Sequence, residues 1–225
     1  MGYLIYFLIL LIVPLYAQFK VKSTFKKYSK VSSTSGLTGA EVARKILNDN
    51  GLFNVGVEET RGYLSDHYDP RAKVVRLSSE NYHGYSVAGT AVAAHEVGHA
   101  IQDANDYSFL RFRHSLVPVA NFSSNFSWIF ILIGIFSGLT GALLLGILLL
   151  AIGVLFQIIT LPVEFNASSR ALKQITTNGI INSNEHVYAK RVLNAAALTY
   201  VAAAAVAVAE LLRLVLIYTG MQNDD

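Results

Sequence analysis

Residues 116–162 form the feature that most restricts how this chain can fold, because they contain no charged side chain. A membrane-spanning helix needs about 20 apolar residues, so this stretch is too long for a single span. The sequence Ser137-Gly-Leu-Thr-Gly141 is the natural break within it, since clustered glycine and polar residues favour turns. We therefore predict two transmembrane helices, at 116–137 and 142–162, that are joined as a hairpin.

Two further apolar runs lie near the ends of the sequence, at 2–17 and 195–218. The first has no charged residue before Lys20, so it lacks the basic start of a signal peptide and is interpreted as an uncleaved membrane anchor. Hydrophobic residues make up 53% of the chain and charged residues only 15%, against about 25% in soluble domains. We expect a mainly α integral membrane protein with about four transmembrane helices.

The basic residues predict how these helices are oriented. Every lysine and arginine except Arg213 falls in 18–112, directly after it at Arg113, or in 163–194. Loops on the cytoplasmic side collect such residues, so both segments are predicted to be cytoplasmic, in a multi-pass protein of the cell membrane. Because the basic residues follow this membrane pattern, we expect the lipid bilayer as a partner and no nucleic acid.

Residues 18–112 form the one sizeable segment that we expect to be soluble, with a small α+β fold. Thr38 and Glu41 have the spacing of a capping box, which predicts a helix that starts there and ends at Gly51. Residues 53–59 and 73–77 have the composition of short strands, and the turn-rich residues 64–70 separate them. A second helix is predicted at about 86–103.

The predicted second helix contains the motif His-Glu-x-x-His at His95, Glu96 and His99. Residues four apart lie on one face of a helix, so both imidazoles could bind one metal ion, with Glu96 as general base toward a water molecule. The alternative is a hydrogen-bonded histidine pair in the core. The flanking residues are small or apolar, which predicts burial, and burying three such side chains without partners is unfavourable. This favours the metal site.

These residue patterns do not identify the third metal ligand. The chain has no cysteine, so zinc would be held by histidine and carboxylate side chains. Any of the other four histidines, or a carboxylate, could complete the site. Glu164 is the first charged residue after the predicted hairpin, on the same side of the membrane as the histidine helix. It is either an interfacial surface charge or a ligand.

Three sequence segments resemble the YugP-type neutral zinc metallopeptidases of bacterial membranes. They are residues 94–102 (AHEVGHAIQ), 113–121 (RHSLVPVAN) and 161–168 (LPVEFNAS). More distantly, Glu164-x-x-Ala167 resembles the Glu-x-x-Ala-Asp element of HtpX-like membrane proteases, in which the glutamate completes the zinc site. The resemblance implies a zincin-like domain with His95, His99 and Glu164 as ligands. Ser168 replaces the aspartate of that element, so Asn166 or Ser168 would have to take over its supporting role.

These observations predict a zinc metalloendopeptidase of the gluzincin type with one Zn²⁺ per chain. Its substrates would be peptides or proteins, including loops of membrane proteins. Tyr82, His83, His67 or Arg170 could stabilise the oxyanion. Two alternatives are an intramembrane protease with the histidine helix in the bilayer, and a non-catalytic membrane scaffold or chaperone-like protein with a structural metal site.

Overall fold

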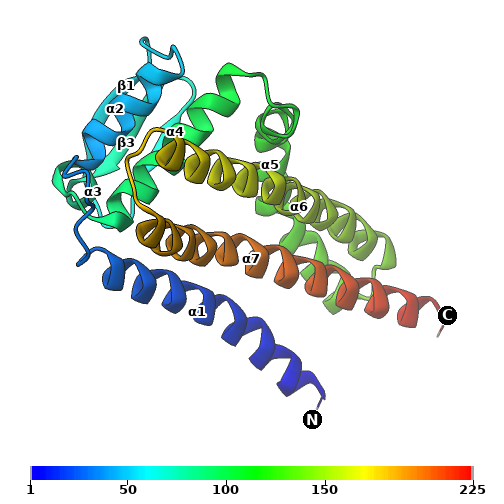
Figure 1. Ribbon diagram of the computed structural model, residues 1–225. Coiled ribbons are helices and arrows are strands. Elements are labelled where there is room, and N and C mark those ends of the chain that lie inside the picture. The colour runs from blue at the N-terminus through cyan, green and yellow to red at the C-terminus, as the bar shows by residue number, and fades with distance from the viewer. Residues whose placement is uncertain (1, 224–225) are drawn as a thin grey trace. The chain divides into compact units, whose positions relative to one another are not determined.

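The computed structural model describes residues 2–223 and is mainly helical (Figure 1). The elements, in chain order, are α1 (Gly2–Tyr28), α2 (Gly39–Asp49), β1 (Gly56–Thr60), β2 (His67–Asp69), β3 (Val74–Ser78), α3 (Ser79–His83), α4 (Val87–Ala104), α5 (Ser108–Ser137), α6 (Thr140–Thr177) and α7 (Ser183–Asn223). Four of them, α1, α5, α6 and α7, are long and apolar enough to cross a membrane. The prediction of about four apolar membrane helices is thus supported.

These four helices are longer than the apolar runs that predict them. Helix α1 continues beyond residue 17 into the basic segment, α6 continues through Pro162, and α7 begins before residue 195. Charged turns at the ends of an apolar helix can remain helical, because their side chains are solvated while their backbone hydrogen bonds are kept. The apolar run sets the length available to a bilayer but not the end of the helix.

The chain divides into two compact units, which are described separately. One consists of the described parts of residues 1–14, 108–162 and 200–225. Within it α5 and α6 pack closely at Gly134, where a Cβ would come within 2.5 Å of Leu143. The predicted break between the two helices is observed, and Gly138 in it adopts a positive φ of 69°. Small residues at such contacts let apolar helices approach closely.

The other unit consists of residues 15–107 and 163–199. It contains a three-stranded sheet in the order β1-β3-β2, in which β1 is parallel and β2 antiparallel to β3. Helices α2 and α4 lie against each other and against the sheet (Figure 1). Their apolar faces, with the sheet and the end of α6, form one core that includes Val42, Ile46, Leu77, Val97 and Ile175.

Local sequence signals predict most of the helices and strands of this unit. The predicted capping box at the start of α2 is present, with Thr38 and Glu41 each accepting from the other's backbone amide. Strands β1 and β3 lie within a few residues of the predicted strands. The turn-rich residues 64–70 also contain a short strand that the sequence does not predict: β2, in which Tyr68 pairs with Val75 of β3. A three-residue strand is too short to give an alternating pattern.

Candidate metal centre

Helix α4 carries the His-Glu-x-x-His motif and lies at the centre of the second unit. It begins after Ser86, whose side chain accepts a hydrogen bond from the backbone N–H of Gly89 at 3.0 Å. Its small apolar residues are buried. His95 and His99 are one turn apart, and their ring centroids are 4.8 Å from each other. The helix therefore presents both imidazoles on one face, as the spacing predicts.

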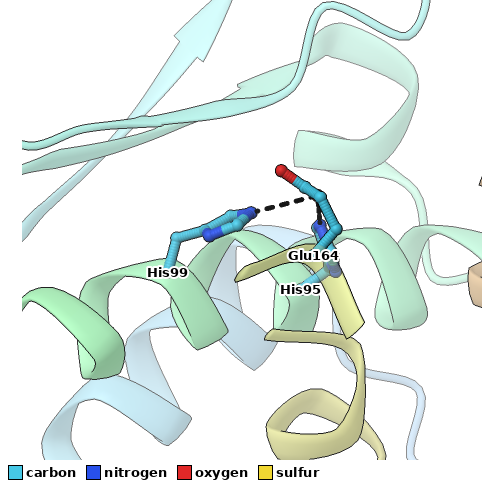
Figure 2. A group of neighbouring side chains, drawn as sticks. All are labelled: His95, His99 and Glu164. Carbon is cyan, nitrogen blue, oxygen red and sulfur yellow. Dashed lines mark ion pairs between the residues drawn. The ribbon is translucent and has the colours of Figure 1, made fainter. Parts of the chain in front are cut away.

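Glu164 of α6 meets this histidine pair (Figure 2). Its Oε2 lies 3.3 Å from His95 Nε2 and 3.6 Å from His99 Nε2. The residue is only 3% exposed, and Oε2 is buried without a hydrogen-bond partner among the described residues. The interpretation of Glu164 as an interfacial surface charge is therefore wrong: it is a buried carboxylate that faces the two histidines.

A close approach between α4 and α6 makes this meeting possible. A Cβ built on Gly98 would lie 2.6 Å from the backbone carbonyl oxygen of Ala167, so a side chain at position 98 would have to displace the α6 backbone. Gly98 lies between the two histidines along α4, and Ala167 is three residues after Glu164. The absence of a side chain at Gly98 therefore allows Glu164 to reach both Nε2 atoms.

The Nδ1 atoms of the two histidines also have partners. His99 Nδ1 lies 3.0 Å from Gln102 Oε1, and His95 Nδ1 lies 3.2 Å from Ser168 Oγ. Gln102 is fully buried, and its amide Nε2 donates to the carbonyl oxygen of Val163 at 2.8 Å and to Asn166 Oδ1 at 3.0 Å. These contacts hold the rings with Nε2 toward Glu164, which is how outer partners orient metal-binding histidines.

Gln102 is the residue that sequence reasoning missed, since its role depends on the backbone of α6 and leaves no local pattern. Of the two candidates for supporting a histidine, Ser168 contacts His95, whereas Asn166 contacts Gln102 and accepts from Arg170 Nε at 2.7 Å.

The electrostatics of the cluster would favour a bound cation. Burial raises the pKa of Glu96, which is 8% exposed, although positive charge on His95 and His99 opposes this. Burial lowers the pKa of His99, but the Glu164 and Glu96 carboxylates outweigh it, and the pKa is raised. The two carboxylates thus favour positive charge at His99. A bound cation would supply such a positive charge in place of a proton.

The donor set fits zinc. Two atoms bound to one tetrahedral zinc ion at about 2.0 Å lie roughly 3.3 Å apart, close to the two histidine–carboxylate separations. One ligand atom from each of His95, His99 and Glu164 can be chosen so that all lie within 4.8 Å of one another. Two histidines and one carboxylate form a known catalytic zinc ligand set that leaves a position for water.

The four residues predicted as candidates for stabilising the oxyanion differ in their contacts and exposure. His83 Nε2 pairs with Glu59 at 3.1 Å, and His67 Nδ1 lies 2.9 Å from the carbonyl oxygen of Ser65. Both imidazoles are exposed. Tyr82 lines a cleft beside α2, together with Glu41 and Arg44. Arg170 contacts Asn166, and through it the network around Gln102. An oxyanion role for any of the four stays a prediction.

Comparison with known proteins agrees with this geometry. Residues 3–219 match the family described as "Putative neutral zinc metallopeptidase". The chain belongs to this family. It is 52% identical over 210 residues to the "Putative membrane protease YugP" of Bacillus subtilis (strain 168), with 93% of each chain covered. No solved structure matches the chain. The predicted resemblance to YugP-type metallopeptidases is confirmed.

Proposed function

We propose that this protein is a membrane-bound zinc endopeptidase in which His95, His99 and Glu164 hold one zinc ion and Glu96 is the general base. The observation that carries the proposal is that Glu164 Oε2 of α6 lies 3.3 Å from His95 Nε2 and 3.6 Å from His99 Nε2. Glu96 follows His95 directly on α4. The family and the relative named as a membrane protease support the same reaction class.

The metal ion and the surrounding side chains would have separate roles in peptide-bond hydrolysis. A bound zinc ion would polarise the scissile carbonyl and lower the pKa of water. Glu96 accepts a proton from the attacking water and returns it to the leaving amine. The raised pKa of Glu96 suits this role, because a base must also release its proton later in the cycle. Gln102 and Ser168 keep both imidazoles oriented toward the metal.

The proposed setting is the cytoplasmic face of the cell membrane. The helices α1, α5, α6 and α7 would span the bilayer, and the unit that carries α4 would lie in the cytoplasm, as the lysines and arginines in 18–112 and 163–194 favour. Helix α4 packs against a sheet and α2 and is not among the candidate spans, which favours this arrangement over an intramembrane protease. Peptides, or loops of membrane proteins, would be its substrates.

Ligand number favours this enzyme over a scaffold with a structural metal. Structural zinc sites are closed by four protein ligands. Among the described residues, the cluster contains three groups that could each give one ligand atom. This leaves a fourth position for water or a carbonyl oxygen.

The test is casein hydrolysis by the full chain, purified in detergent. We expect activity that a zinc chelator abolishes. Glu96→Gln should retain zinc but cleave about 10²–10⁴-fold more slowly, the range that general bases contribute. Glu80→Gln, at an exposed position, is the matched control and should cleave like wild type. Wild-type cleavage by a zinc-loaded Glu96→Gln protein would overturn the mechanism.

A further inference from the structure

A cleft of about 580 Å³ separates α1 from α7 within the second unit, and it is distinct from the metal centre. Most of the lining side chains are basic, hydroxyl-bearing or amide side chains, and two are apolar. Those on α1 are Lys20, Ser23, Thr24, Lys27 and Tyr28, and those on α7 are Arg191, Asn194, Ala195 and Leu198. The volume is in the range of small-molecule sites.

The charge in this cleft is entirely positive. Three cations line it, and no carboxylate among the described residues does. Arg191 is held in place because its Nη1 donates to Tyr28 Oη at 2.9 Å. Lys27 Nζ lies 5.5 Å from the centroid of the same ring. Cations gathered without a counter-charge repel one another, so an anion in the cleft would be favoured.

The position of the cleft along the two helices indicates what kind of anion fits. On α1 the apolar run ends at residue 17 and Lys20 follows within one turn; on α7 the apolar run begins at Ala195, directly after Asn194. The Arg191–Tyr28 hydrogen bond places the basic ends of both segments at the same level. Along α7, Ala195 and Leu198 follow Arg191 into the apolar run, and along α1, Lys20 lies two turns before Tyr28. The cleft thus lies where the apolar runs of both helices meet their basic residues, which is where the surface of a bilayer would be.

We propose that this cleft binds the phosphate-bearing headgroup of an anionic phospholipid. Lys27 and Arg191 would bind the phosphate, with Ser23, Thr24 and Asn194 as further hydrogen-bond partners. Lys20 would reach along α1 toward the headgroup, and Leu198 would contact the start of an acyl chain. Basic pockets between membrane helices are suited to such headgroups because charge attraction and apolar contact act on one molecule.

The test compares two pairs of lysines on the same helix. Lys22 and Lys26 are exposed on α1, like Lys20 and Lys27, but do not line the cleft. Binding of phosphatidylglycerol to the full chain in neutral detergent is measured by native mass spectrometry, with phosphatidylcholine as the uncharged reference. Each lysine near an anionic surface contributes about fivefold to affinity. Lys20→Gln/Lys27→Gln should therefore weaken phosphatidylglycerol binding about 25-fold, and Lys22→Gln/Lys26→Gln by less than about threefold.

Several results would overturn the proposal. Equal weakening by both pairs would mean general attraction to a basic helix rather than a site, and no weakening by either would exclude the cleft. Arg191→Gln, a third variant, must also weaken binding. Displacement of the lipid by inorganic phosphate at equal concentration would assign the site to free phosphate instead. All lysines involved are exposed, so unfolding midpoints should match wild type and keep loss of binding separate from loss of fold.

Discussion

Gly98 lies directly against Ala167, so close that a Cβ on Gly98 would come within 2.6 Å of the Ala167 carbonyl oxygen. This contact joins the helix that carries both histidines to the helix that carries Glu164. The proposed zinc site therefore depends on a position that supplies no ligand. The distance between the two backbones decides whether the carboxylate reaches the imidazoles.

Gly98→Ala should destabilise the protein and weaken zinc binding. In a helix interior, alanine is normally favoured over glycine by about 1 kcal/mol. Here the added methyl group must push the α6 backbone away, and such overpacking costs about 1–3 kcal/mol. Gly153→Ala is the matched control, because Gly153 lies within α6 and has nothing within 4 Å of its Cβ position. Chemical unfolding and zinc titration should show a loss for the first variant only; a fully stable, zinc-loaded Gly98→Ala protein would contradict the close contact.

Gln102→Leu should weaken zinc binding while the ligands remain in place. Its Oε1 faces His99 Nδ1 at 3.0 Å, and its Nε2 joins the histidine to the backbone of α6. Loss of an outer partner typically lowers metal affinity by about 10- to 100-fold. Gln174→Leu is the control, since Gln174 lies on α6 and its amide Nε2 donates to Asn50 Oδ1 at 3.1 Å rather than to a residue of the site. Equal zinc affinity in both variants would remove Gln102 from the site.

Asp69 should give the fold a dependence on acid. The hydrogen bond from Arg76, with those from the backbone amides of Ala72 and Arg71, lowers the pKa of Asp69 from 3.8 to about 2. Because the folded-state pKa lies below the unfolded value, the stabilisation is present above about pH 4 and is lost as the pH falls toward 2. Asp69→Asn should reduce the stability difference between pH 5 and pH 3 in urea unfolding. An unchanged difference would mean that other carboxylates account for the acid sensitivity.

The sequence predicts the histidine pair well, because helical periodicity and the capping residue Ser86 are local signals. It also predicts the break between α5 and α6, where Ser137–Gly141 interrupts an apolar run. The meeting of Glu164 with the histidines is different in kind. It requires two segments about 65 residues apart to pack closely. The residues alone make Glu164 one of several candidate ligands, and the family resemblance selects it.

Two parts of the site are not predictable from local patterns. Gln102 follows His99 by three residues and resembles any polar residue near a helix end; its importance comes from Val163 and Asn166 on another helix. Likewise, glycine at position 98 lowers helix propensity, and only the approach of Ala167 explains why the helix contains it. Such tertiary contacts override local preference and are visible only once the chain is folded.

The most direct test of the central claim is the zinc content of the detergent-purified full chain. The variants are His99→Ala and Glu164→Ala, with His83→Ala as a control at an exposed histidine. We expect one zinc ion per chain in wild type and in the control, and its loss or marked weakening in both ligand variants. Full zinc in Glu164→Ala would move the third ligand to another residue. No zinc in folded wild type, even after zinc is supplied, would contradict the metal site and the proposed peptidase with it.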